Sequence, residues 1–307
     1  MLVAKAGLLT TVQDLGRWGY QSFGVSVAGP MDRFSHRLAN LLVGNSTSAA
    51  GLEITLLGPD VEFQDDVRCA VTGAEFEIFV DGNRMPLNAA WIVPKGAHLR
   101  FGDRRRGARA YLAIAGGLDV PQQLGSRATH LATGMGGYRG RHLQAGDRLK
   151  IGQASSGQLS RMHQVQSVVS LPSENIRLRV ILGPQDQMFS KDALLMFQSS
   201  RYQVSPESNR MGYRLLGSSI TSDKADQLLS DATPMGSIQV PASGKPIILM
   251  ADGQTAGGYP KIATVITADL PLAGQLMPGD WITFDLCDRE TAVTALIEQE
   301  QKLLSIS

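Results

Sequence analysis

Two short polar segments in the C-terminal half of the sequence hold the residue types that could do chemistry. Residues 205–214 place two guanidinium groups, an amide, a phenol and a carboxylate around one glycine, and residues 252–261 mix Asp, Gln, Thr, Tyr and Lys with three glycines. Glycines let the backbone approach a ligand closely and offer its N–H groups. A predicted strand at 237–241 can bring Gln239 to the same place. We expect these segments to form two walls of one cleft; the alternative is that both are ordinary long turns.

Metal and triad chemistry find little support in the sequence. The histidines are scattered, and none forms a pair at metal-ligand spacing with another His, Cys or carboxylate; they are His36, His98, His130, His142 and His163. No Gly-x-Ser-x-Gly elbow occurs, so a Ser-His-Asp triad cannot be identified. We expect no bound metal. The basic run at 104–106 is interpreted as a solvated hairpin tip.

Composition limits the partners. The chain has 29 basic and 28 acidic residues, and this balance provides no overall field to attract nucleic acid or an anionic membrane. A small molecule or another protein is the expected partner. Cys69 and Cys287 are far apart in sequence and are expected to be reduced core residues. No secretory signal and no apolar run of about 20 residues is found, so we predict a cytoplasmic protein.

The chain is organised as many short strands separated by glycine turns, which predicts a mostly β protein with few helices. Expected strands include 61–63, 70–72, 78–80 and 91–93, and a glycine turn followed by an alternating strand recurs at 94–101, 145–151 and 278–284. Helices are expected after Asp32, Asp186 and Asp288, each of which can act as an N-cap. Residues 152–173 are typical of a linker, so we predict two domains, 1–160 and 161–307.

The N-terminal half contains second-rank candidates for a site. These are residues 29–32, residues 72–74, Arg127 and Glu53. Glu53 lies in an otherwise apolar strand, and a buried carboxylate requires a partner, for which Arg17 is one possibility.

Six motifs, in order along nearly the whole chain, resemble the allophanate hydrolase subunit 2 family, also called biotin-dependent carboxyltransferases. Within the family the similarity is greatest to the stand-alone C-type subunits of bacterial ATP-dependent 5-oxoprolinases. The motifs are residues 11–19, 39–45, 52–55, 115–121, 208–215 and 257–260. Each motif is weak by itself, and the six in register are specific.

The resemblance implies a fold and partners. It implies two cyclophilin-like β-barrel domains with a few peripheral helices. It also implies a complex with a B-type subunit, of the kinase-inhibitor type, and an A-type subunit, of the lactam-utilisation type, in which ATP is used to open 5-oxo-L-proline to L-glutamate. A single chain is then expected to be inactive alone. The sequence contains no Ala-Met-Lys-Met motif, so this chain has no biotin attachment site.

The resemblance also gives the candidate residues their roles. Phosphorylating an amide oxygen turns a poor electrophile into a good one, and charge then builds on phosphoryl and carbonyl oxygens. Arg210, Arg214 and Lys261 would stabilise that charge, and Glu207 and Asp252 would transfer protons. Substrate orientation would fall to Asn209, Tyr213, Gln239, Gln254, Thr255, Gly257, Gly258 and Tyr259.

Two other functions remain open at this point. The chain could be a regulatory module that antagonises a partner of the kinase-inhibitor type. It could also be part of a carboxyltransferase or amidohydrolase that acts on urea or allophanate.

Overall fold

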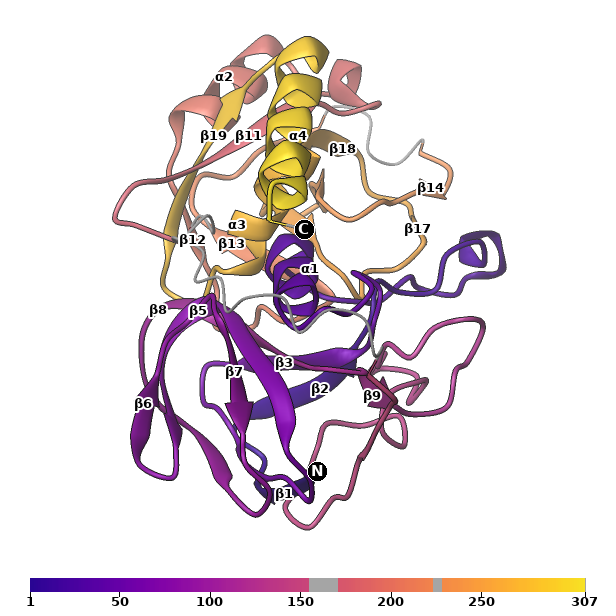
Figure 1. Ribbon diagram of the computed structural model, residues 1–307. Helices are drawn as coiled ribbons and strands as arrows, with labels where there is room; N and C mark the ends of the chain where they lie inside the picture. Colours follow the sequence, from indigo (N-terminus) through magenta and orange to yellow (C-terminus); the bar gives the residue numbers. More distant parts are fainter. Residues whose placement is uncertain (155–170, 223–227, 307) are drawn as a thin grey trace. The chain divides into compact units, whose positions relative to one another are not determined.

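The computed structural model describes residues 1–154, 171–222 and 228–306 (Figure 1). The chain forms two compact units, one of Met1–Arg17, Ala28–Leu171 and Lys302–Ser307, the other of Trp18–Val27 and Pro172–Gln301. The domain boundary predicted near residue 160 lies outside the described residues. Both units are mostly β with few helices, which confirms the predicted class.

The first unit is built on an antiparallel sheet of eight strands. Its two longest strands, β5 (Val67–Val80) and β8 (His98–Ile114), pair along most of their length. Strand β8 is also the middle strand of the order β1-β4-β8-β3-β2, and β5 pairs in addition with β6 and β7. A two-stranded sheet is added by β9 and β10. The remaining bounds are β1 Leu2–Lys5, β2 Leu9–Gln13, β3 Gly51–Thr55, β4 Asp60–Glu62, β6 Asn83–Met85, β7 Ala90–Val93, β9 Leu118–Asp119 and β10 Lys150–Ile151.

The length of β5 and β8 corrects two sequence-based expectations. Residues 70–72 and 78–80, expected as separate strands, are parts of β5, because the left-handed Gly73 (φ +85°) and nearby bulges bend that strand without ending it. The basic run 104–106 is inside β8 and is not a hairpin tip. Two of its arginines bond to carboxylates of β5, Arg105 to Glu77 and Arg106 to Glu75.

Helix α1 (Arg33–Leu42) begins and ends where the sequence predicts. The Asp32 carboxylate accepts a hydrogen bond from the Ser35 amide at 2.8 Å, as an N-cap should, and Gly44 is left-handed (φ +81°) just beyond the end. The helix packs on β5 and β8 through Ala39 and Val43.

The second unit is a closed barrel of seven strands in the order β11-β18-β15-β16-β13-β12-β19. Among the described residues, closure of a barrel is found only here. The pair β11–β19 is parallel and the other pairs are antiparallel. The bounds are β11 Ile176–Leu182, β12 Tyr202–Val204, β13 Gly212–Leu216, β15 Ser237–Gln239, β16 Ile247–Leu249, β18 Lys261–Val265 and β19 Trp281–Leu286.

Shorter elements surround this barrel. A two-stranded sheet pairs β14 (Asp231–Ala232) with β17 (Ala256–Gly257), and the helices are α2 (Lys191–Ser199), α3 (Leu270–Gly274) and α4 (Arg289–Leu304). Single 3-10 turns occur at Gln21–Phe23, Asp186–Met188 and Thr267–Asp269. No helix in the described part of the chain is long and apolar enough to cross a membrane.

The helices of the second unit match the sequence unevenly. Asp288 caps α4 through the Thr291 amide at 2.8 Å, as predicted. Asp186 begins only a 3-10 turn, because Phe189 is extended; α2 starts after Ser190, whose hydroxyl caps it. Val293 and Ile297 recur at helical spacing in the sequence, a pattern typical of a packed helix face, but in α4 both side chains are exposed.

The two cysteines are free and differ in environment. Cys69 is fully buried, and burial raises the pKa of its thiol. Cys287 is only partly buried, so the expectation that both are core residues is correct for Cys69 alone.

His36 provides a pH test of the first unit. It is 1% exposed, with Nε2 at 3.1 Å from the Gln13 carbonyl oxygen, and burial lowers its pKa below the ordinary 6.5. Below pH 6.5 the imidazole of His36 is therefore protonated in the unfolded chain while it is still neutral in the folded chain. The stabilising contribution is complete above 6.5 and is lost as pH falls, so we expect the melting temperature to drop from pH 7.5 to 5.0, and less steeply in His36→Gln.

The matched control is His98, an exposed side chain. A hydrogen bond to Asp60 raises its pKa, so its contribution is present below pH 6.5 and lost as pH rises. His98→Gln should leave the acid-side decline unchanged. Equal slopes in wild type and His36→Gln would contradict the assignment.

Candidate functional site

The second unit contains a pocket of about 460 Å³ on the outer face of its barrel. This volume lies within the range of small-molecule sites, about 300 to 1,000 Å³. The pocket brings together both polar segments predicted from the sequence and Gln239. The predicted residues that line it are Glu207, Asn209, Arg214, Gln239, Gln254 and Tyr259.

Strand register explains why these residues share one face. Arg214 of β13 pairs with Ile247 of β16, and Ile247 pairs with Gln239 of β15. Residues directly opposite each other in a sheet point to the same side, and neighbours along a strand point to opposite sides. Arg214 and Gln239 therefore share the outer face, whereas Tyr213, one residue earlier, is 2% exposed and lies in the barrel core.

The pocket also contains a cation that the sequence did not single out. Lys245 lines it, and its Nζ donates to the Gly217 carbonyl at 2.6 Å. Arg214 is 59% exposed and lies 3.7 Å from the Glu207 carboxylate. Lys245 precedes β16 by two residues in a short turn, where the sequence pattern alone carries no functional signal.

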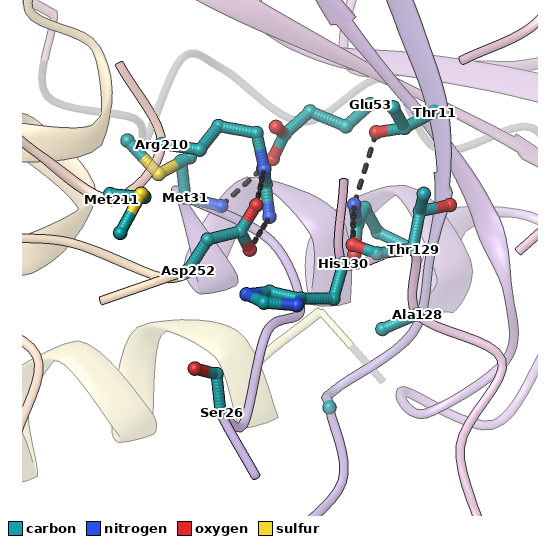
Figure 2. A network of polar contacts seen from close by, with 12 residues as sticks. Thr11, Ser26, Met31, Glu53, Ala128, Thr129, His130, Arg210, Met211 and Asp252 are labelled. Atoms are coloured by element: carbon teal, nitrogen blue, oxygen red, sulfur yellow. Dashed lines mark hydrogen bonds and ion pairs between the residues drawn. The ribbon is translucent and has the colours of Figure 1, made fainter. Parts of the chain in front are cut away.

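Arg210 and Asp252 do not line the pocket; they form a buried ion pair (Figure 2). The guanidinium donates to the carboxylate through Nε and Nη2, each at 2.9 Å, and the side chains are 4% and 3% exposed. The Asp252 amide also donates to the Arg210 carbonyl at 2.9 Å. This pair fixes one polar segment against the other, so its geometry is that of a structural clamp.

Lys261 is also buried and also paired. Its Nζ donates to Asp231 at 2.7 Å and to the Ala232 carbonyl at 3.0 Å, and the side chain is 2% exposed. The hydrogen bond from Lys261 is the main cause that lowers the pKa of the Asp231 carboxyl. Asp231 belongs to β14, which pairs with β17, so Lys261 anchors the small sheet that carries Gly257.

Gly257 packs against two amide side chains. A Cβ atom at this residue would lie 2.6 Å from Gln239 Nε2 and 2.7 Å from Gln254 Nε2. At neighbouring Gly258 the nearest atom to such a Cβ is Ser230 Oγ at 3.8 Å, which is ordinary contact. The sequence predicted backbone contact with a ligand at Gly257; the structure shows that its missing side chain makes room for Gln239 and Gln254.

Thr255 and Tyr259 are the remaining residues of the predicted set. Thr255 contributes its carbonyl, which accepts a hydrogen bond from the Thr233 amide at 3.0 Å. Tyr259 is 47% exposed at the pocket.

Among the second-rank candidates of the first unit, Glu53 and Thr72 are buried and Arg127 is partly buried. Glu53 is 1% exposed, and its Oε2 accepts a hydrogen bond from the Met31 amide at 2.8 Å (Figure 2). The same oxygen accepts a second hydrogen bond from the Tyr111 hydroxyl, also at 2.8 Å. Thr72 donates to the Ser35 carbonyl at 2.7 Å. The sequence did not identify Met31 and Tyr111 as the partners of Glu53. These contacts tie α1 and the loop before it to the sheet.

A search of the described residues for three or more His, Cys, Asp or Glu side chains able to hold one metal ion finds none.

The chain belongs to the carboxyltransferase domain family. The family model described as "Carboxyltransferase domain, subdomain A and B" matches residues 23–286. This stretch spans the polar segments and the pocket described above.

Relatives of two kinds are similar to this chain. The chain is a homologue of the C subunit of 5-oxoprolinase from Escherichia coli strain K12, with 42% identity over 97% of this chain and 95% of that protein. The urea amidolyase of Saccharomyces cerevisiae is 35% identical over 92% of this chain and 16% of its own length. The crystal structure of Kluyveromyces lactis urea amidolyase has a TM-score of 0.90 and 32% identity, covering 100% of this chain and 20% of that longer one.

The buried pair predicts a large asymmetry between two arginine substitutions. Arg210→Met leaves Asp252 as a buried, uncompensated charge, so the free energy of unfolding should fall by about 3 to 5 kcal/mol. Arg177→Met is the control, because Arg177 is 70% exposed and 3.5 Å from Asp285. Its loss should be about 0 to 1 kcal/mol. Urea denaturation measures both; equal losses would contradict the clamp.

The two adjacent glycines allow a second matched test. Gly257→Ala must displace the amide ends of Gln239 and Gln254, which are flexible, so the fold should survive while the pocket wall changes. Gly258→Ala meets open space and should change neither. In NMR spectra, we expect the side-chain amide signals of both glutamines to shift in Gly257→Ala only. Unchanged signals in that variant would show that the two amides do not pack on Gly257.

Proposed function

We propose that this chain is the C-type subunit of an ATP-dependent 5-oxoprolinase, acting with an A-type subunit of the lactam-utilisation type and a B-type subunit of the kinase-inhibitor type. The support is the identity of 42% to a 5-oxoprolinase C subunit, which extends over almost all of both chains. The complex would work in the cytoplasm and would be inactive without this chain. No lysine of this chain would carry biotin.

The reaction in this proposal proceeds through an activated lactam. The terminal phosphoryl group of ATP is transferred to the lactam oxygen, and one water adds to the ring carbon. The ring C–N bond then breaks with protonation of nitrogen and leaves an acyl phosphate, which a second water hydrolyses to the carboxylate and inorganic phosphate. Because the amide oxygen becomes a better leaving group once phosphorylated, the step needs groups that stabilise negative charge on oxygen. In the pocket, the exposed guanidinium of Arg214 would hold the carboxylate of the substrate, and Gln254 would donate to the oxygen that carries this charge.

Burial supports two different roles for the predicted catalytic residues in this proposal. Arg214, Gln254, Asn209 and Tyr259 line the pocket and would contact the ligand. Arg210, Asp252 and Lys261 are each 4% exposed or less and paired, so they would position the walls. As part of the same proposal, we place the ATP-binding site on the partner subunits. The reason is that the cations lining the pocket of this chain are one exposed arginine and one lysine.

We further propose that both units are cyclophilin-like barrels divided near residue 160. Supporting this are the closed seven-stranded barrel of the second unit and the strongly bent eight-stranded sheet of the first.

The second candidate is a role in a carboxyltransferase or amidohydrolase of the urea or allophanate type. One observation favours it: the TM-score of 0.90 to Kluyveromyces lactis urea amidolyase. The match to the 5-oxoprolinase C subunit covers 95% of that protein, whereas the urea amidolyases are much longer than the matched region, and this difference favours the first proposal.

Reconstitution tests the proposal. The purified chain is mixed with partners of the A and B types, and glutamate formation from 5-oxo-L-proline is measured with and without ATP. We expect activity only with all three proteins and ATP, and a fall of about tenfold or more in kcat/KM for Arg214→Met, the scale expected when one charged hydrogen bond to the transition state is lost.

Pull-down of the partners by Arg214→Met provides the control and should be unchanged. Full activity of the A-type and B-type partners without this chain would overturn the proposal. Turnover of urea or allophanate in place of 5-oxoproline would favour the second candidate. Turnover by the A-type and B-type partners that this chain lowers while it binds them would favour a purely regulatory module.

A further inference from the structure

One wall of the pocket contains a polar group that the protein leaves incomplete. Gln239 is 1% exposed, and among the described residues its Nε2 has no hydrogen-bond partner. A buried amide donor without an acceptor costs about 1 to 3 kcal/mol, so such groups are normally satisfied in the working state of a protein. The acceptor can come from a neighbouring side chain, an ordered water molecule or a ligand.

Gln254 is the neighbour that can supply it. Its Nε2 and that of Gln239 lie within 2.7 Å of one point, the position of a Gly257 Cβ. Rotation of a carboxamide by half a turn exchanges its oxygen and nitrogen with almost no change of shape. A rotated Gln254 would place its Oε1, an acceptor, where its Nε2 lies beside Gly257, on the side of Gln239 Nε2, and would move its own N–H groups to the other end of the carboxamide.

The lining of the same pocket has an excess of positive charge. Arg214 and Lys245 line the pocket with one carboxylate, Glu207, which is 77% exposed. The distance of 3.7 Å between Arg214 and Glu207 is longer than a charge-assisted hydrogen bond, about 2.7 to 2.9 Å. The guanidinium fork therefore retains donors for a second carboxylate, and the two groups of Gln254 and Arg214 face one cavity.

We propose that this pocket binds a small ligand carrying both a carboxylate and an amide carbonyl, with Arg214 on the carboxylate and Gln254, oriented by Gln239, on the carbonyl oxygen. Ile247 and Leu249 form an apolar floor for the carbon skeleton between these two groups. The inference rests on the proposed function for the choice of ligand, since 5-oxoproline carries both groups. Gln254 is then a specificity-determining residue and Gln239 a positioning residue.

Calorimetric titration of the full chain tests the two contacts separately. The probes are 5-oxo-L-proline, pyrrolidinone, which lacks the carboxylate, and proline, which lacks the ring carbonyl. Arg214→Met and Gln254→Met are compared with two controls outside the pocket. Arg177→Met removes a similarly exposed arginine with a similarly loose ion pair, and Gln203→Met removes a glutamine whose Nε2 bonds to the Gly279 carbonyl.

We expect wild type to bind 5-oxo-L-proline more tightly than either fragment. Arg214→Met should weaken 5-oxo-L-proline about tenfold, as loss of a charged hydrogen bond does, and leave pyrrolidinone unchanged. Gln254→Met should weaken 5-oxo-L-proline and pyrrolidinone and leave proline unchanged. Gln239→Met should resemble Gln254→Met if it orients that residue. The control variants should match wild type.

Two results would overturn the site. One is the absence of saturable binding of 5-oxo-L-proline by wild type up to about 50 mM, which is weaker than any useful substrate affinity. The other is equal affinity of the pocket and control variants.

The reconstituted complex separates the site from the proposed function. Ligand binding that depends on Arg214 and Gln254, with no glutamate formed by the complex, would overturn the function and keep the site. Glutamate formation that requires this chain but is unaffected by Gln254→Met and Arg214→Met would keep the function and overturn the site.

Discussion

The arrangement of the pocket depends on the ion pair between Arg210 and Asp252. These residues are 42 positions apart in the sequence, and their side chains meet where less than 5% of either is exposed. Burying two charges is unfavourable unless they are paired and hydrogen bonded. The two segments that carry these residues therefore cannot separate without breaking the pair. The backbone hydrogen bonds from Asp252 to Arg210 and from Met250 to Met211 run beside the pair. Together they hold the two polar segments at a fixed distance across β13 and β16.

Side chains of the same type have different tasks in this unit because strand register decides their direction. Arg214 faces outward in the pocket, whereas Arg210 and Lys261 are buried and neutralised by Asp252 and Asp231. A buried, paired cation cannot contact a ligand without losing its partner, and this loss is costly. Two of the three predicted cations are therefore buried outside the pocket lining, whereas the third, Arg214, lines the pocket. Lys245, absent from the sequence-based set, takes a place in the pocket.

The pocket is better suited to binding and charge stabilisation than to proton transfer. Its described lining contains one carboxylate, Glu207, which is largely exposed to water. Such a pocket is consistent with a subunit of an enzyme complex in which other subunits supply the groups for proton transfer. In the first unit the buried polar groups, such as Glu53 with Met31 and Tyr111, are joined to each other and fix α1 on the sheet.

The sequence by itself determined the class, the family resemblance, the capped start of α1 at Asp32, the cap of α4 at Asp288 and the two segments that reach the pocket, because caps, glycine turns and alternation are local patterns. It could not determine that β5 continues through Gly73, since a bulge and a turn look alike until the partner strand is present. Only the tertiary structure decided which polar residues face one another: the pairing of Arg210 with Asp252, of Lys261 with Asp231, and of two amides over Gly257. These contacts join residues distant in sequence, and strand register, which no local pattern encodes, sets them.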